Sequence, residues 1–398
     1  MDPASTHSLN RRQMILGSGV LLAGISQAKQ GAAQVAVEGE KDLIFRTTDP
    51  RNAEPALNKL IESWITPTER FYVRSHAPNP VIDQSDYRLA VEGMVDRELS
   101  LSIADLTKFK EYDITATLTC AGNRRAEFNA EGKVGGVQWE AGAIGNATWT
   151  GVSLDEVLKL AGIKDGAKHV WFEGLDEIAK EGPNGEPTIP FGASIPLEKL
   201  AHQGDLPGAM LVYKMNGKPL TADHGFPLRT LVPGYIGARS VKWVGRVIVS
   251  DTTSPNHYLA TAYKLVKKTD PLDWSEAGPI YRYLVNAAIG SHGENTELSA
   301  GNVSLAGYVL PSGLLGAKVT SVEVSIDGGD NWQETELHGD QQDYCWQLWK
   351  TDVTVSGSTK EILVRAKDNA GGFMPERVPW NAKGYLQNSW YRLPVTVN

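Results

Sequence analysis

The pattern of hydrophobic and polar positions divides the chain into two parts of different texture. From about residue 45 to about residue 265, short β-prone runs such as Ile114–Leu118 alternate with short helical segments. From about residue 270, no helix of useful length is predicted, and Val319–Ile326 and Trp332–Leu337 predict two strands joined by the tight turn Asp-Gly-Gly-Asp-Asn. Further predicted strands are Tyr344–Trp349, Lys360–Lys367 and Trp390–Val397.

Two helices are predicted in the first part. The clearer one is Thr150–Gly162, which carries an apolar stripe of leucine and valine, the capping-box pair Ser153 and Glu156, and a glycine that can end it. Ser194–Leu200 predicts a second short helix with Pro196 in its first turn.

These patterns predict an α+β protein of two folded domains, which suits a length of 398 residues. We expect residues 40–265 to form a mixed α+β domain whose loops carry functional side chains. Residues 270–398 are expected to form an all-β, immunoglobulin-like sandwich.

The first 33 residues predict a targeting signal. Arg11 and Arg12 stand directly before the apolar run Met14–Ile25, and small residues suited to cleavage follow. Twin arginines in this position indicate the Tat route, which exports folded proteins, and therefore a periplasmic location. The alternative is a chance arginine pair before a short anchor helix. Outside this segment no apolar stretch reaches the ~20 residues of a membrane helix, so no membrane association is expected.

Charge and cysteine content narrow the possible functions. A formal net charge of −8 argues against a nucleic-acid partner, because phosphate binding needs a surplus of lysine and arginine. The two cysteines, Cys120 and Cys345, have no zinc-like spacing and no C-x-x-C-H haem-attachment motif around them. One disulfide between them is possible, although an exported chain of this size does not require it. Cys345, between Tyr344 and Trp346 on a predicted strand, is expected to pack in the core.

The segment around Cys120 is the sharpest candidate for chemistry. A β-prone run delivers Cys120 into a loop that also holds Gly122, Asn123, Arg124 and Arg125. Arginines beside a thiol favour the thiolate, the form that ligates metals, and they favour an oxyanion substrate. A buried cysteine acting as a small hydrophobe is the alternative from the residues alone.

This loop, Cys-Ala-Gly-Asn-Arg-Arg, resembles the cofactor-site cysteine loop of the sulfite oxidase family of molybdopterin oxidoreductases. Further segments resemble family motifs in the same order along most of residues 45–398. They are Phe71–His76, Phe172–Asp176, Phe191–Pro196, Met215–Leu220, Asp223–Arg229 and Pro233–Trp243. Within the family, the resemblance points to bacterial, haem-free periplasmic sulfite dehydrogenases.

The resemblance implies a molybdenum cofactor with one pyranopterin, bound by residues 40–265, and Cys120 as the single protein ligand of the metal. A polar, anionic, multi-ring ligand needs cations for its phosphate and scattered hydrogen-bonding groups for its rings. By resemblance, the pterin and its phosphate would be held by Phe71, Tyr72, Val73, Arg74, Ser75, His76, Asp176, His224, Arg229, Ser240, Val241 and Lys242. For His224 alone, a core histidine would be the simpler interpretation.

The resemblance also implies a cationic substrate pocket. Arg74 and Arg125 match the anion-binding arginines of the family, Trp139 matches a pocket tryptophan, and Tyr263 matches a tyrosine near the metal. Catalytic roles would therefore fall to Cys120, Tyr263, Arg74 and Arg125. For Arg124 the alternative is a pair with a carboxylate, and Lys133 falls near a family lysine in a loop of different length.

Lys383 marks a departure from the family pattern. Animal members carry Trp-Asn-x-Arg-Gly where this chain has Trp380-Asn-Ala-Lys383-Gly. Lysine keeps the charge and loses the two-pronged guanidinium. Lys383 would either enter the substrate pocket or only stabilise the contact between the domains.

The function implied by the resemblance is oxidation of sulfite to sulfate, with no haem in this chain and electrons passed to a soluble c-type cytochrome. A homodimer is implied through the C-terminal sandwich. The alternatives are nitrate or sulfoxide reduction on the same scaffold and, of a different class, a non-enzymatic periplasmic binding protein built on the sandwich.

Overall fold

The computed structural model describes residues 42–182, 185–269, 271–275 and 277–398, which belong to one compact unit. The predicted signal at residues 1–33 lies outside the described residues. No helix among the described residues is both long and apolar enough to cross a membrane.

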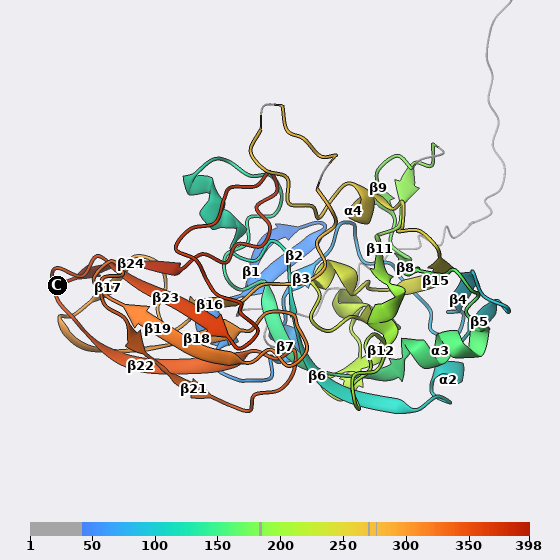
Figure 1. The fold of residues 1–398 in the computed structure, drawn as a ribbon, viewed down its shortest axis with the longest axis horizontal. Helices are drawn as coiled ribbons and strands as arrows, with labels where there is room; N and C mark the ends of the chain where they lie inside the picture. The colour runs from blue at the N-terminus through green and yellow to red at the C-terminus, as the bar shows by residue number, and fades with distance from the viewer. Residues whose placement is uncertain (1–41, 183–184, 270, 276) are drawn as a thin grey trace, which may run out of the picture. The chain divides into compact units, whose positions relative to one another are not determined.

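The first part of the molecule is built from small sheets with short helices on their edges (Figure 1). A three-stranded sheet has the order β1 (Leu43–Thr48), β2 (Arg51–Pro55), β3 (Val73–Arg74). A five-stranded sheet has the order β11 (Gly192–Pro196), β8 (His169–Gly174), β15 (Val244–Ser250), β4 (Leu89–Gly93), β5 (Leu99–Leu101). Another has the order β13 (Lys218–Pro219), β12 (Met210–Met215), β7 (Ile144–Ser153), β6 (Glu111–Thr119), with β14 (Arg229–Leu231) also paired to β12. β9 (Ile178–Ala179) pairs with β10 (Thr188–Ile189).

The helices are all short. The α-helices are α1 (Leu57–Leu60), α2 (Ile103–Leu106), α3 (Leu154–Ala161) and α4 (His257–Ala260). The 3-10 turns are η2 (Thr68–Arg70), η3 (Arg125–Ala130), η4 (Leu197–Leu200), η5 (Ala222–His224) and η6 (Gly237–Arg239).

The predicted helix at Thr150–Gly162 is present as α3, but its first turn differs. Residues 150–153 are the end of β7, and Gly162 ends the helix at a φ of 76°. The predicted capping box is wrong: the Ser153 hydroxyl lies 2.8 Å from His202 Nε2, and the Glu156 carboxylate accepts from the Tyr112 hydroxyl. Both side chains are bound by residues far away in the sequence, so neither closes the box.

The predicted helix at Ser194–Leu200 is also wrong in its first half. Ser194 and Ile195 belong to β11 and pair with Trp171 and Val170 of β8. Only the last four residues turn, as η4. Pairing with a buried neighbouring strand outweighs the local helical preference.

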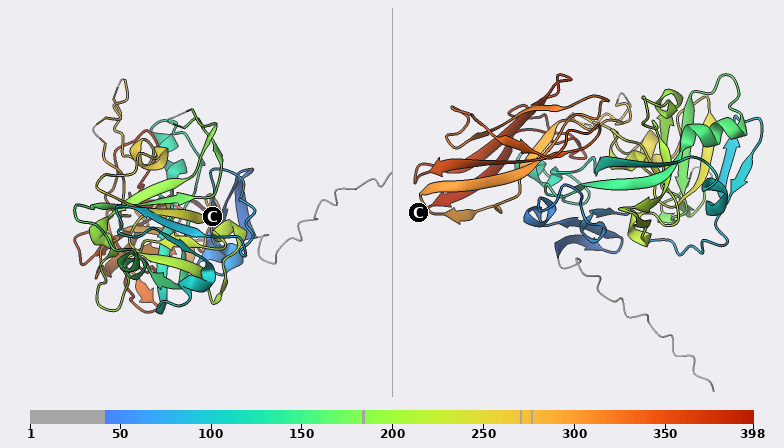
Figure 2. Two further views of the ribbon diagram at one scale, coloured as in Figure 1. Left: turned by 90° about the vertical axis from the view of Figure 1, so that its right-hand side faces the viewer. Right: turned by 90° about the horizontal axis from the view of Figure 1, so that it is seen from below.

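The second part is a pair of sheets, as predicted for a β-sandwich. One has the order β16 (Asn286–Ile289), β18 (Gly301–Leu310), β22 (Gln347–Val355), β21 (Glu336–His338). The other has the order β17 (Thr296–Leu298), β24 (Tyr391–Val397), β23 (Glu361–Asp368), β19 (Val319–Ser325), β20 (Gln333–Glu334). These strands, orange to red, gather on one side of the described region, away from β4, β5, β8 and β15 (Figures 1 and 2).

Two strand predictions in this part need correction. Trp332–Leu337 is not one strand, because β20 pairs with β19 while β21 pairs with β22 in the other sheet. Tyr344–Trp349 begins as a turn, and β22 starts at Gln347. Cys345 therefore precedes the strand, although it is buried as predicted and its thiol donates to the Thr115 carbonyl.

A shared core joins the two parts. One hydrophobic cluster combines Ala121, Ile144 and Ile236 of the first part with Tyr308 and Trp346 of the second. Because the Cys120 loop borders this cluster, its position depends on both parts of the chain.

Candidate functional site

Cys120 lies at the point where β6 ends and an irregular loop begins. Backbone hydrogen bonds hold this loop in place: Cys120 N–H donates to the Ala143 carbonyl, and Arg124 N–H donates to the Glu140 carbonyl. The Asn123 amide oxygen accepts from the Ala143 N–H at 2.9 Å. The Cys120 sulfur accepts a hydrogen bond from the Gly122 N–H at 3.4 Å.

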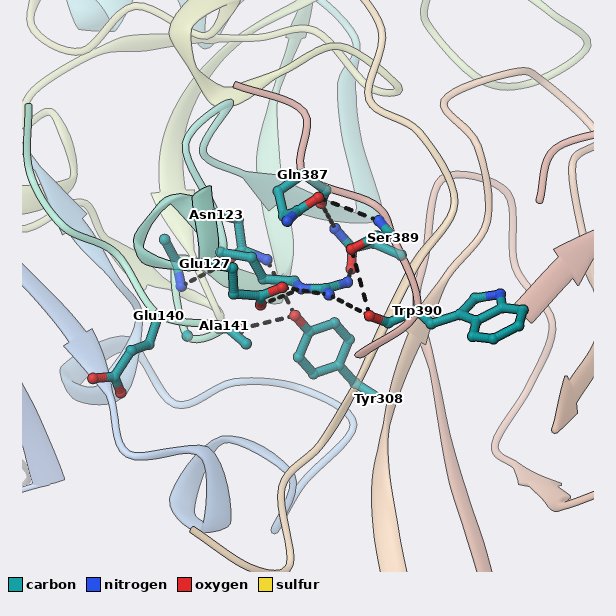
Figure 3. Close-up of polar contacts among 12 residues, drawn as sticks. Asn123, Glu127, Glu140, Ala141, Tyr308, Gln387, Ser389 and Trp390 are labelled. Atoms are coloured by element: carbon teal, nitrogen blue, oxygen red, sulfur yellow. Dashed lines mark hydrogen bonds and ion pairs between the residues drawn. The ribbon is translucent and has the colours of Figure 1, made fainter. Parts of the chain in front are cut away.

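The C-terminal sandwich holds the other side of this loop. Tyr308 of β18 accepts from the Asn123 side chain at 3.1 Å and donates to the Ala141 carbonyl at 2.9 Å (Figure 3). Arg124 binds both oxygens of the Glu127 carboxylate, at 2.7 and 2.8 Å, and also donates to the Trp390 carbonyl. The metal-ligand candidate is therefore fixed by residues of both parts of the chain.

A cavity opens in front of Cys120. Twelve predicted site residues line it: Phe71, Tyr72, Arg74, Ser75, His76, Cys120, Asp176, His224, Arg229, Ser240, Lys242 and Tyr263.

Three cations in the cavity wall lack carboxylate partners among the described residues. The Lys242 ammonium donates to the Ser75 hydroxyl and the Asp223 carbonyl. Arg229 donates to the carbonyls of His224 and Ser240, and Arg74 donates to the Asn52 amide oxygen and the Ser75 carbonyl. Buried positive charge without a counterion is costly and favours a bound anion.

Burial lowers the pKa of two of these cations. Burial, with a contribution from Arg229, lowers the pKa of Lys242 to about 7. Burial likewise lowers the pKa of Arg229 to about 10. An anion in the cavity would favour the charged form of both groups and reverse these shifts.

The two histidines of the cavity wall are neutral. Burial lowers the pKa of His224 to about 4, and its Nε2 lies 3.0 Å from the Thr68 carbonyl. Since that carbonyl can only accept, Nε2 carries the proton and Nδ1 is left as an acceptor. Burial, followed by the charges of Arg74 and Lys242, lowers the pKa of His76 well below its usual range.

Tyr263 is held in an unusual backbone conformation beside His76. Its φ is +50°, in the left-handed region that residues other than glycine seldom adopt. Its hydroxyl lies 3.3 Å from His76 Nε2, and its ring stacks on Tyr385 with centroids 5.1 Å apart. Strained residues of this kind cluster at functional sites, where surrounding contacts hold them in place.

Five predicted site residues do not line the cavity. The side chains of Val73 and Val241 are buried and are not part of the cavity lining. Trp139 is fully buried and packs in the core cluster behind Cys120 and Phe71, so it supports the wall instead of forming it. The two others are Arg125 and Lys383.

Arg125 lies just behind the wall. Its guanidinium donates to the carbonyls of Lys383 and Val137, at 2.8 Å each. Gly122 and Gly136 make room for it, since a Cβ at either position would come within 3 Å of its guanidinium nitrogens. The Lys383 ammonium turns away and lies 5.4 Å from the Trp274 ring centroid. Only the Lys383 backbone contacts Arg125, which favours the structural alternative for this lysine.

Six residues of the cavity wall were not predicted as site residues: Leu118, Phe191, Asp223, Gly237, Ala238 and Trp243. All of these residues except Leu118 lie within the matched segments Phe191–Pro196, Asp223–Arg229 and Pro233–Trp243, so those segments could have indicated them. Phe191 stacks on His76 with centroids 4.9 Å apart, a contact between distant segments that no local pattern reveals.

The residues present fit a molybdenum–pyranopterin cofactor. A thiol at one end of the cavity can ligate a metal, while Arg229 and Lys242 can bind a phosphate. His224 Nδ1, the Asp176 carboxyl and the Ser240 hydroxyl add hydrogen-bonding groups for a polar ring system. Asp176 is buried and accepts from the Phe191 N–H, and burial raises its pKa.

Comparison with known proteins gives the same assignment. Residues 76–258 match the oxidoreductase molybdopterin binding domain, and residues 277–398 match the Mo-co oxidoreductase dimerisation domain. The chain is 36% identical to the sulfite oxidase of Arabidopsis thaliana over 376 residues, covering 88% of this chain and 93% of that protein. It is 40% identical to the mitochondrial sulfite oxidase of Rattus norvegicus over 371 residues, covering 89% of this chain but only 66% of that protein.

A solved structure shares the fold. The sulfane dehydrogenase SoxCD from Paracoccus pantotrophus superposes with a TM-score of 0.74 at 23% identity, covering 96% of each chain. With matches to both domains and extensive identity to the Arabidopsis protein, the chain belongs to the sulfite oxidase family of molybdopterin oxidoreductases.

Proposed function

We propose that this protein oxidises sulfite to sulfate with a molybdenum–pyranopterin cofactor. The observation that carries the proposal is the cavity in front of Cys120, where the buried Arg229 and the half-buried Arg74 and Lys242 have no carboxylate partner among the described residues. Such a wall suits an anionic cofactor and an anionic substrate together. The bound cofactor would supply the two-electron redox chemistry and the transferred oxygen.

The side chains of the candidate site would have separate roles. The Cys120 sulfur would ligate the metal, and Arg229, Lys242 and His224 would hold the pterin and its phosphate. Arg74 on the wall and Arg125 behind it would attract sulfite and orient it through charge-assisted hydrogen bonds. The Tyr263 hydroxyl, beside a neutral His76, can move a proton to or from that nitrogen.

We further propose that the protein is exported folded by the Tat route and works in the periplasm as a homodimer. Support for export comes from Arg11 and Arg12 before an apolar run, and support for the dimer comes from the match of residues 277–398 to a dimerisation domain. Electrons would pass to a separate acceptor, for which a soluble c-type cytochrome is our candidate. Stopped-flow mixing of sulfite-reduced protein with oxidised cytochromes tests this step.

The central test replaces Cys120 with serine. For Cys120→Ser we expect a folded protein whose sulfite-dependent reduction of ferricyanide falls at least about 100-fold, because loss of a ligand should exceed the 10- to 100-fold effects of residues that only orient ligands. Molybdenum content, measured by elemental analysis, should fall as well. Retained turnover in a variant with full metal content would contradict the role of Cys120.

Cys345→Ser is the matched control. Cys345 is also buried, and its thiol donates to the Thr115 carbonyl at 3.2 Å, a contact that a serine hydroxyl can also make. We expect this variant to keep its turnover and its molybdenum.

Nitrate-dependent oxidation of a reduced dye by the unaltered protein, without sulfite oxidation, would instead assign nitrate reduction to this scaffold.

A further inference from the structure

Tyr385 belongs to a C-terminal segment that reaches back to the Cys120 loop. The Asn381 side chain closes this segment into a turn, because it donates to the Tyr385 carbonyl and accepts from the Tyr385 N–H, each at 2.9 Å. The next residue, Leu386, donates its N–H to the Ala121 carbonyl at 2.8 Å. The backbone of Tyr385 is therefore fixed on both sides.

The ring of Tyr385 contacts both Tyr263 and Arg125. It stacks on Tyr263 with centroids 5.1 Å apart and 15° between the ring planes. The Arg125 guanidinium lies over the same ring, 5.0 Å from its centroid. Aromatic stacking and cation–π contacts of this geometry are both attractive.

Arg125 depends on such contacts because it lacks a carboxylate partner among the described residues. Its other contacts are two backbone carbonyls, which leave its positive charge uncompensated. A tyrosine ring can orient a guanidinium without neutralising it, whereas a carboxylate would cancel the charge that attracts an anion.

We propose that Tyr385 is a positioning residue of the oxyanion site, whose ring holds Arg125 and Tyr263 in the orientation that receives the substrate. The inference rests on the proposed function for the identity of the anion, and on the stacked ring and the guanidinium contact for the role. Burial, with the neighbouring Tyr263 and Cys120 adding and Arg125 and Arg74 opposing, raises the pKa of Tyr385 and keeps it neutral. Its ring, not its hydroxyl, carries the role.

The experiment compares Tyr385→Leu with Tyr385→Phe in the cofactor-loaded protein. We measure KM and kcat for sulfite and, independently of turnover, the Kd for sulfate by calorimetry. Tyr385→Leu should raise KM and Kd about tenfold, equivalent to about 1.4 kcal/mol. Tyr385→Phe keeps the ring and should stay within about twofold of the unaltered protein. A Kd unchanged in the leucine variant, or raised as much in the phenylalanine variant, overturns the proposal.

Tyr391→Leu is the matched control. Tyr391 has the same 7% exposure as Tyr385 and also lies under an arginine, but that arginine is Arg124, 5.2 Å from its ring centroid, and not Arg125. The Tyr391→Leu variant should have a lower melting temperature, with the KM for sulfite and the Kd for sulfate unchanged. An equal loss of sulfate affinity in both leucine variants would overturn the specific role of Tyr385.

A second variant guards against misfolding of Tyr385→Leu. Asn381→Ala removes both hydrogen bonds that set the Tyr385 backbone and should raise the Kd for sulfate in the same direction by about threefold, since about 0.65 kcal/mol corresponds to that factor. An unchanged Kd there counts against the proposal. If the unaltered protein does not oxidise sulfite, the proposed function is wrong. The Kd values for sulfate still test the role of Tyr385 in that case.

Discussion

Two adjacent arginines, Arg124 and Arg125, are both buried, but their charges have partners of different kinds. Arg124 is fully buried and forms a two-pronged ion pair with Glu127. Burial alone would lower the pKa of Arg124, but Glu127 outweighs it and raises that pKa. Arg125, in contrast, is held by two carbonyls and a tyrosine ring. One charge is neutralised inside the protein and the other is left available.

The same difference separates two regions. Where the two parts of the chain meet, Arg124 has the Glu127 carboxylate as its partner (Figure 3) and also donates to the Asn286 amide oxygen and the Trp390 carbonyl. In the cavity, Arg74, Arg229 and Lys242 have no carboxylate partner among the described residues. Neutralised charge fixes structure, and buried charge without a partner indicates a place for an anionic ligand.

The largest expected effect comes from breaking the neutralised pair. Arg124→Met should lower the free energy of unfolding by about 3 kcal/mol, near the lower end for a broken buried ion pair because Glu127 remains about one-third exposed to water. Loss of the contacts to Asn286 and Trp390 adds to the effect. Chemical unfolding measured by fluorescence gives this value.

Arg125→Met is the comparison for that measurement. Removal of a buried charge without a counterion should change the free energy of unfolding by less than about 1 kcal/mol. The Kd for sulfate should instead rise about 10- to 100-fold, as expected for loss of a charge-assisted hydrogen bond worth about 1.5 to 3 kcal/mol. The contrast between the two arginines would break down if Arg125→Met proved the less stable variant.

The pH dependence of the free energy of unfolding tests the cavity region through Lys242. In the cofactor-free protein its pKa is lowered to about 7 from the ordinary 10.5, mainly by burial. Between these two values the unfolded chain binds more protons at this lysine than the folded chain, so the free energy of unfolding should rise with pH. The slope contributed by Lys242 should approach about 1.4 kcal/mol per pH unit, and Lys242→Met should remove it.

An added anion sharpens this test. Inorganic pyrophosphate bound in the cavity should keep Lys242 charged and flatten its slope. Lys199 is the control, because burial and then Arg282 lower its pKa to about 8, but it lies over the rings of Tyr235 and Tyr344, outside the cavity wall. The slope removed by Lys199→Met should not respond to pyrophosphate. If both slopes respond equally, the cavity does not bind the anion specifically.

Local sequence patterns predicted the strands better than the helix ends. The β-prone runs Ile114–Leu118 and Val319–Ile326 were sufficient because both form paired strands, within β6 and β19. The capping box at Ser153 and the helix at Ser194 were wrong because partners more than 20 residues away, His202 and the strand β8, compete for the same groups. Such contacts are invisible to a window that covers one or two turns.

The candidate site shows the same limit. The motif residues that line the cavity could be named because each stands in a contiguous matched segment. The direction of a side chain could not: Trp139 packs behind the wall, and Lys383 turns outward while its carbonyl binds Arg125. Tyr385 was not named, since its contacts with Tyr263 and Arg125 join segments more than 100 residues apart.

The smallest expected effect concerns Lys383, whose ammonium lies over Trp274 and outside the cavity wall. Lys383→Met should change the KM for sulfite by less than about twofold at physiological salt, where exposed charges are screened over about 8 Å. At low salt it should lower kcat/KM modestly, because the lost charge no longer helps to attract the anion. Steady-state kinetics at two ionic strengths measures both values. A tenfold rise in KM at physiological salt would place the ammonium in the pocket, and the distinction between Lys383 and Arg125 would then have to be abandoned.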